Sequence, residues 1–85
     1  MITLDAAGLR EKTQAHEYLM EALALPDYYG KNLDALYDCL TELGETEIQF
    51  VNLDTAAGSY FSKVLDLFQE AQADNPRLHL YYDLD

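Results

Sequence analysis

The order of apolar and polar residues along this chain predicts three strands and three helices. Short apolar runs bounded by turn residues mark the strands, at 2–4, 48–53 and 78–82. Between them, apolar residues recur at helical spacing over about 14–25, 33–43 and 60–74. Strands separated by helices need crossover connections. We therefore predict an α/β fold, with a small three-stranded parallel sheet flanked by helices in the order β-α-α-β-α-β.

Polar and special residues at the ends of these segments set the expected boundaries. A side chain able to cap a helix precedes each one, and the predicted N-caps are Thr13, Asn32 and Ser59. Pro26 stands just beyond a first helix that we expect to end near Ala24 or Leu25. Asn75 and Pro76 close the third helix. We predict a loose connection at 6–8 and a turn at 54–58.

Length and composition predict one small domain that spans residues 1–85. Hydrophobic residues make up 49% of the chain, which is too many for a disordered acidic tail. The lone Cys39 cannot form an internal disulfide, and we expect it to be a small core residue rather than a nucleophile. The start MITLDAAG has neither a basic nor an apolar leader pattern. We therefore expect a cytoplasmic protein.

The charge balance narrows the kind of partner. Five basic residues against sixteen acidic ones give a formal net charge of -11. Such a field repels nucleic acid and anionic membranes and attracts cationic macromolecules. We therefore expect a basic protein as partner, with no direct binding to nucleic acid or membrane.

Three of the acidic residues form a row on the second predicted helix. Asp34, Asp38 and Glu42 are spaced i, i+4, i+8, so they share one stripe opposite the apolar face. Carboxylates four apart weaken a helix by roughly 0.2–0.5 kcal/mol per pair. A chain with no use for the row would be expected to break it with lysine. The alternative is that the row only solvates a helix face.

The segment Asp-Tyr-Tyr-Gly-Lys at 27–31 precedes this helix. Tyrosines often anchor loops in a half-buried position, and we expect that role for at least one of Tyr28 and Tyr29. An exposed tyrosine beside an acidic helix is also a good binding surface. We expect Gly30 to supply a turn with positive φ. Tyr37 extends the surface between Asp34 and Asp38.

Signals for catalysis are weak, and we predict a protein that is not an enzyme and has no cofactor or metal. The chain has no phosphate-binding glycine loop, no zinc-spaced Cys/His cluster and no nucleophile elbow. We interpret His16 as a packing or surface residue and His79 as a strand residue with a satisfied ring. An enzymatic role would require Asp34, Asp38 and Glu70 to converge on a metal or substrate pocket.

The run LALPDYYGKNLDALYDCL at 23–40, with VLDLFQEA at 64–71, closely resembles the barstar-like family. Its members are intracellular inhibitors of secreted, barnase-type ribonucleases. The family has a three-stranded parallel sheet flanked by helices, which agrees with the order predicted above. The resemblance implies a ribonuclease inhibitor that occludes a cationic active site, in a 1:1 complex, with an acidic helix and a Tyr-Tyr-Gly loop.

The resemblance also implies roles for individual residues. Asp38 matches the aspartate that enters the ribonuclease active site and occupies a phosphate position, and Asp34 matches the neighbouring acidic contact. Tyr28 matches the loop tyrosine that packs on the catalytic histidine, and Glu70 a peripheral acidic contact. Further matched interface positions are Gly30, Asn32, Leu33, Ala35 and Thr41.

The chain departs from the family pattern at the edge of this surface. The type member has tryptophan in place of Tyr37 and Leu43, glycine in place of Glu42 and glutamate in place of Lys31. We keep Tyr37, Glu42 and Leu43 among the predicted partner-binding residues. The segment between the second strand and the last helix is also shorter, so we expect the extra helix there to be reduced to the turn at 54–58.

A second function class stays open at this point. The same face fits an acidic protein-interaction module that binds some other basic protein. In either case we expect the free protein to be monomeric. A convex carboxylate surface would favour binding, whereas a concave pocket with shielded carboxylates would favour catalysis.

Overall fold

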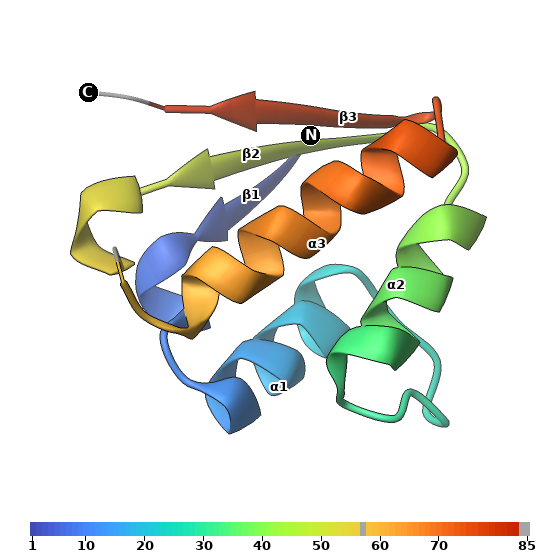
Figure 1. Cartoon of the computed structure of the whole chain (residues 1–85). Helices are drawn as coiled ribbons and strands as arrows, with labels where there is room; N and C mark the ends of the chain where they lie inside the picture. Colours follow the sequence, from blue (N-terminus) through green and yellow to red (C-terminus); the bar gives the residue numbers. More distant parts are fainter. Residues whose placement is uncertain (57, 84–85) are drawn as a thin grey trace.

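The computed structural model describes residues 1–56 and 58–83 and has the predicted order of elements (Figure 1). The strands are β1 (Ile2–Asp5), β2 (Thr46–Val51) and β3 (Leu78–Tyr82). The helices are α1 (Lys12–Ala22), α2 (Leu33–Glu42) and α3 (Tyr60–Asp74). Two short 3-10 helices complete the described elements, η1 (Ala6–Leu9) and η2 (Leu53–Ala56). The predicted α/β fold is confirmed.

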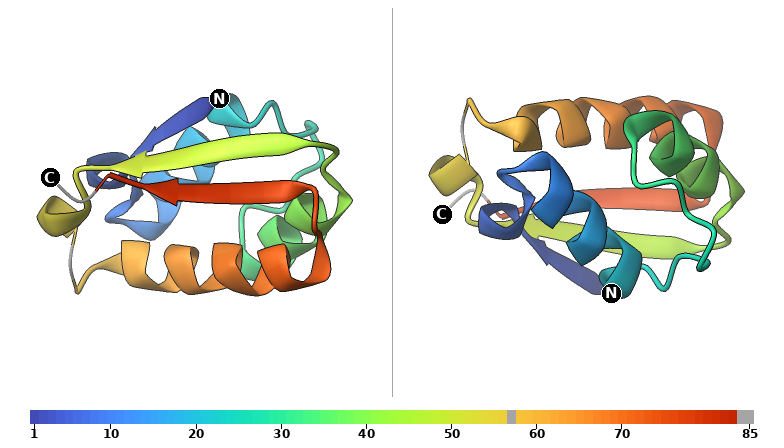
Figure 2. Two further views of the ribbon diagram at one scale, coloured as in Figure 1. Left: turned by 90° about the horizontal axis from the view of Figure 1, so that it is seen from above. Right: turned by 90° about the horizontal axis from the view of Figure 1, so that it is seen from below.

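The three strands form one parallel sheet in the order β1-β2-β3, with β2 in the middle. Ile48 of β2 lies opposite Ile2 on one side and Leu80 on the other. All three helices lie on the same side of the sheet, as the two views of Figure 2 show. Among the described residues, no helix covers the opposite face of the sheet. No helix among the described residues is long and apolar enough to cross a membrane.

The core lies between the sheet and the helices. Phe50 of β2 is at its centre and packs edge-on against Phe61 and Phe68 of α3, with ring centroids 5.8 and 5.2 Å apart. The apolar stripe of α2 contributes Leu36 and Leu40, which are fully buried. Burial of these stripes supplies the main drive for folding, since isolated helices this short are marginal in water.

The first helix differs from the prediction at both ends. It begins at Lys12 after Glu11, whose side chain makes no capping bond, so Thr13 lies inside the first turn and is not the N-cap. It ends at Ala22, earlier than Ala24 or Leu25, because Ala24 is left-handed with φ 52. The Leu25 amide then bonds to the Met20 carbonyl, as in a Schellman motif. Glycine usually takes the left-handed position of this motif. Because alanine takes it here, the end of the helix could not be recognised from the sequence.

Of the other predicted boundaries, the starts of α2 and α3 are confirmed, while the connection at 6–8 and the second strand differ from the prediction. Asn32 caps α2 through a 2.8 Å bond from the Ala35 amide, and Ser59 caps α3, both as predicted. The connection at 6–8 is not loose, because the Asp5 carboxylate caps η1. The second strand starts two residues before 48 and stops at Val51, since Asn52 is left-handed with φ 57. η2 begins at Leu53, one residue before the predicted turn at 54–58, and ends at Ala56; residue 57 lies outside the described residues.

Asn75 joins the end of α2 to the turn between α3 and β3. It is buried, and its side-chain nitrogen donates to the carbonyls of Leu40 and Leu43, each at 2.9 Å. Its side-chain oxygen accepts from the Arg77 amide at 3.1 Å. The carbonyls at the end of a helix have no partner within the helix, so this one amide satisfies two of them. Asn75 therefore fixes α2 against α3.

We expect Asn75→Ala to lower the free energy of unfolding by about 2 kcal/mol, because the Leu40 and Leu43 carbonyls and the Arg77 amide each lose the hydrogen bond that they make with Asn75. Urea unfolding measures the change. The exposed Gln14→Ala on α1 serves as the control and should shift stability by less than about 0.5 kcal/mol. A loss for Asn75→Ala no larger than that of the control would contradict this role.

Candidate functional site

A groove of about 420 Å³ runs between the loop that precedes α2 and α2 itself, and we call it the loop–α2 groove. These two segments lie at the lower right of Figure 1. The groove is lined by Leu23, Ala24, Leu25, Pro26, Tyr28, Tyr29, Gly30, Ala35, Asp38, Cys39, Glu42 and Leu43. Most of these side chains are apolar, while Asp38 and Glu42 bring exposed carboxylates to it. The groove therefore offers apolar contact beside negative charge.

A buried histidine holds the loop in place. The Nδ1 atom of His16 lies 2.5 Å from the hydroxyl of Tyr29, and its Nε2 atom lies 2.7 Å from the hydroxyl of Tyr60. A neutral imidazole donates from one nitrogen and accepts at the other, so one tyrosine accepts and the other donates. We call this the Tyr29–His16–Tyr60 network. It ties the loop to α1 and α3.

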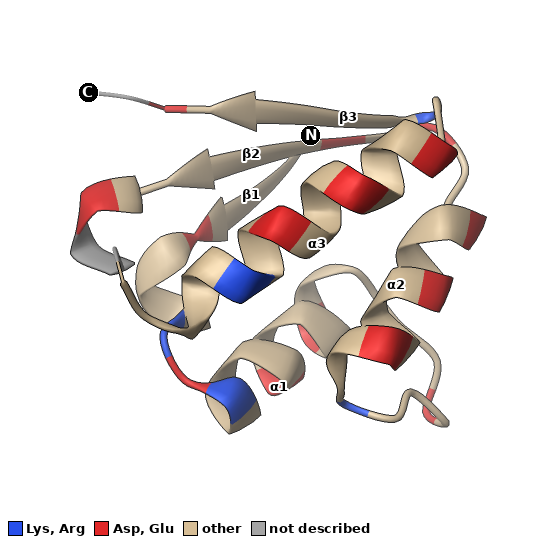
Figure 3. Ribbon diagram, viewed as in Figure 1, with Lys and Arg blue, Asp and Glu red and all other residues tan. Residues whose placement is uncertain are grey.

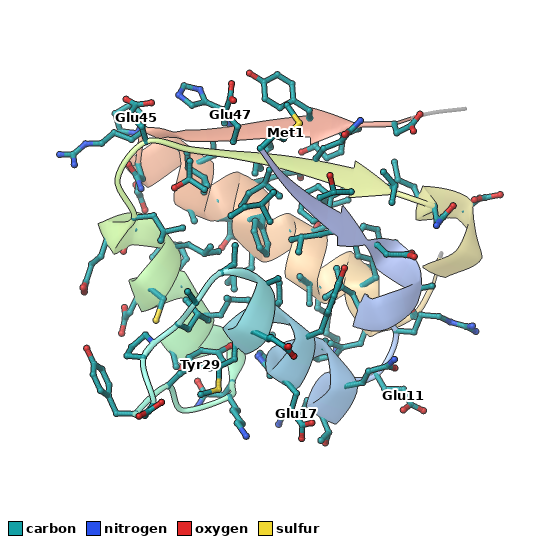
Figure 4. All side chains as sticks on the ribbon, turned by 180° about the vertical axis from the view of Figure 1, so that it is seen from behind. Met1, Glu11, Glu17, Tyr29, Glu45 and Glu47 are labelled. Atoms are coloured by element: carbon teal, nitrogen blue, oxygen red, sulfur yellow. The ribbon has the colours of Figure 1, made fainter. Side chains whose placement is uncertain are left out.

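The two consecutive tyrosines have opposite environments. Tyr29 is buried, 5% exposed, and lies where the loop meets the helices (Figure 4). Tyr28 is 88% exposed. The prediction that at least one of the two tyrosines anchors the loop is therefore confirmed for Tyr29, while the Tyr28 side chain is accessible. Because the anchor is rigid, Tyr28 is presented from a fixed backbone.

Gly30 was expected to supply a turn with positive φ, and this prediction was wrong. The left-handed residue of this turn is Lys31, with φ 54, and Gly30 does not have a positive φ. A Cβ atom on Gly30 would lie 3.2 Å from the Asn32 side-chain nitrogen and 3.4 Å from the Ala35 Cβ atom. That same nitrogen donates to the Gly30 carbonyl at 3.2 Å. Glycine is present for close approach to the start of α2.

The predicted acidic row lies along the outer side of α2, where Figure 3 shows it in red. Asp34, Asp38 and Glu42 are all exposed. A second row faces the same side of the molecule from α3 (Figure 3) and consists of Asp66, Glu70 and Asp74. Only Glu70 of this row is among the predicted partner-binding residues, although all three share the i, i+4, i+8 spacing of the row on α2.

The structure divides the twelve predicted partner-binding residues into three groups. Those that line the loop–α2 groove are Tyr28, Gly30, Ala35, Asp38, Glu42 and Leu43. Those that line a second pocket at the start of α2 are Asn32, Leu33 and Asp34. Those that line neither are Tyr37, Thr41 and Glu70. The Tyr37 hydroxyl donates to Asp74, and the Thr41 hydroxyl donates to the Asp38 carbonyl at 3.0 Å. Partner contact by all twelve stays a prediction.

Burial shifts the pKa values of four side chains, His16, Tyr29, Cys39 and Tyr60, and those of Cys39 and His16 bear on the chemistry of the site. Burial raises the pKa of the Cys39 thiol, and the nearby Glu42 and Asp38 add to the shift. The thiol is therefore protonated and a poor nucleophile, although it lines the groove. Burial lowers the pKa of His16, and the charge of Lys12 lowers it further. His16 is therefore held in its neutral form within the network.

The three carboxylates that an enzymatic role would require do not line one and the same pocket. Asp38 lines the loop–α2 groove, Asp34 lines the second pocket and Glu70 lines neither, and all three are exposed. Among the described residues, no group of three or more His, Cys, Asp or Glu side chains is placed to hold a metal ion. Exposed carboxylates beside an open apolar groove are suited to binding a macromolecule.

We expect the free energy of unfolding to fall between about pH 7.5 and pH 5.5, in part through His16. Its pKa is lowered in the folded protein, so the unfolded chain takes up the proton first. The stability that neutral His16 contributes is complete above its unfolded-state pKa, near 6.5. It is lost progressively as pH falls below that value toward the lower folded-state pKa.

Urea unfolding across this range measures the fall. His16→Gln should flatten the dependence, while Gln14→Ala, an exposed change on the same helix that removes no titratable group, should leave it in place. An equal slope in His16→Gln and the unaltered protein would contradict the assignment.

Comparison with known proteins identifies the family. The family model described as barstar, the barnase inhibitor, matches residues 1–83. A protein of Bacillus subtilis (strain 168), named "Putative ribonuclease inhibitor YrdF", is 40% identical over 78 residues, which cover 86% of each chain. With a match over nearly its whole length and the three-stranded parallel sheet already described, the chain belongs to the barstar family.

Proposed function

We propose that this protein inhibits a basic ribonuclease by binding over its active site in a 1:1 complex. The observation that carries the proposal is one groove that joins an exposed tyrosine to exposed carboxylates, in a chain of net charge -11. A ribonuclease holds RNA phosphates with cationic groups. Carboxylates on a rigid helix fill such a site without offering a bond to cleave. Inhibition is therefore by occlusion, and the inhibitor itself is not an enzyme.

The exposed side chains in and around the groove have separate parts in this proposal. Asp38 takes the position of an RNA phosphate, and Asp34 and Glu70 meet cationic groups around it. Tyr28 packs on a ring of the enzyme, where its 88% exposure leaves most of the side chain available for contact. The Tyr29–His16–Tyr60 network holds the loop before the partner arrives. A surface that is already ordered loses less conformational entropy on binding.

The membership of the barstar family and the name of the Bacillus subtilis relative support a ribonuclease as the target. We propose a barnase-like, secreted enzyme and a cytoplasmic inhibitor. Leu43 and Glu42 line the groove where the family's type member has tryptophan and glycine. The groove edge is therefore less aromatic and more acidic, which adapts it to a ribonuclease with its own pattern of basic groups.

We expect the protein to suppress a basic ribonuclease at one molar equivalent and to cleave no RNA on its own. Titration against a panel of secreted microbial ribonucleases, including any that the source organism encodes, measures both. The break in the activity curve should fall at a 1:1 ratio. Absence of inhibition across the panel, together with capture of a basic protein that does not cleave RNA, would favour the acidic interaction module instead.

We expect Asp38→Ala to weaken binding by at least about 2 kcal/mol, or roughly 30-fold, because it leaves a desolvated cationic pocket of the enzyme without its partner. Stability should hold or rise by about 0.5 kcal/mol, since the change removes repulsion with Asp34 and Glu42 and improves helix propensity. Calorimetric titration and urea unfolding on one sample separate the two effects.

The matched control is Glu17→Ala, which removes the same charge from an exposed position of α1. It should change the affinity only slightly, through the net charge. A destabilised Asp38→Ala variant with unchanged affinity would refute the role of Asp38 as the central contact.

A further inference from the structure

A second pocket, of about 290 Å³, lies where the three helices begin. It is lined by Lys12, Asn32, Leu33, Asp34, Tyr60 and Lys63. Lys12 is the first residue of α1 and Tyr60 the first of α3, while Leu33 is the first of α2. The pocket thus collects side chains from segments far apart in the sequence. We call it the two-lysine pocket.

The lysines stand out against the charge of the chain. There are only five Lys and Arg residues in 85, and two of them line this pocket. Both are exposed. Among the described residues the ion pair present joins His79 to Glu45, so neither lysine makes a close ion pair with a described carboxylate. Asp34 also lines the pocket, so two positive charges stand against one negative charge there and the pocket is net positive.

This positive site adjoins the acidic row. Asp34 begins the row and also lines the pocket, and the first turn of α2 passes from the pocket toward the loop–α2 groove. Figure 3 shows blue at the starts of α1 and α3 on the same side of the molecule as the two red rows. The face that carries the carboxylates is therefore bipolar, with its positive end at the two-lysine pocket.

We propose that the two-lysine pocket receives an Asp or Glu side chain of the ribonuclease, next to the cationic site that Asp38 fills. The inference rests on the proposed function and names a second contact for the same partner. A face made only of carboxylates would be repelled by any acidic side chain that borders the enzyme's active site. Two lysines turn that repulsion into attraction and fix the register of the two surfaces. They also select ribonucleases that carry an acidic group there.

The opposite view is that the lysines only solvate the starts of α1 and α3. The two views predict affinity changes of opposite sign when both lysines are replaced. Replacing both lysines with glutamine makes the chain more negative by two charges, which by long-range attraction should speed association with a basic enzyme. If the pocket holds a carboxylate, the same change removes its partner, and the complex should dissociate faster.

The experiment compares three double variants with the unaltered protein. Lys12→Gln with Lys63→Gln removes the pocket charges, and Lys12→Arg with Lys63→Arg keeps them. Arg10→Gln with Arg77→Gln removes the same net charge from exposed positions that line neither the groove nor the pocket. Association and dissociation rates are measured by stopped flow with the ribonuclease found by titration. A pH of about 8 keeps His16 neutral in every variant, and urea midpoints confirm that each is folded.

We expect the glutamine variant of the pocket to bind about tenfold more weakly, through faster dissociation. The arginine variant should bind like the unaltered protein, and the Arg10/Arg77 variant should bind as tightly or more tightly. A pocket glutamine variant that binds as tightly as the Arg10/Arg77 variant would overturn the pocket proposal while leaving the proposed function intact. If the unaltered protein binds no ribonuclease, both proposals fall.

Discussion

The position of the loop depends on one buried side chain. His16 is fully buried in α1, and each of its ring nitrogens is satisfied by a tyrosine hydroxyl, one from the loop and one from α3. A buried polar group without a partner costs about 1–3 kcal/mol, so the three rings form a unit in which each needs the others. Through this unit the core fixes the backbone of Tyr28 and one wall of the loop–α2 groove.

Stability and binding make opposite demands on α2. Its outer row of carboxylates weakens the helix, while its inner residues Leu36 and Leu40 are fully buried. The helix is held at both ends by asparagine side chains, Asn32 at its start and Asn75 at its end. Neither contact involves the outer face. The charges that a partner would meet are thus supported from residues that the partner need not touch.

The sequence predicted those features whose signals are local. Helical spacing of Phe61, Val64 and Phe68 predicted α3, and Asn32 predicted the start of α2. Features assembled from distant segments had no such signal: the two partners of His16 lie 13 and 44 positions away in the chain.

Backbone conformation was the other gap. The left-handed residues at the end of α1 and in the loop are Ala24 and Lys31. Glycine is the residue usually found in this conformation, so neither position could be recognised from the sequence. The two-lysine pocket could not be predicted either, because Lys12 and Lys63 come to line one pocket only in the folded chain.

Backbone hydrogen exchange, in the free protein and in its complex with the ribonuclease, tests most directly whether the loop–α2 groove faces the enzyme. Added protection is predicted at 27–35, with exchange in the sheet unchanged. Protection confined to β3 and the face of the sheet opposite the helices would contradict it.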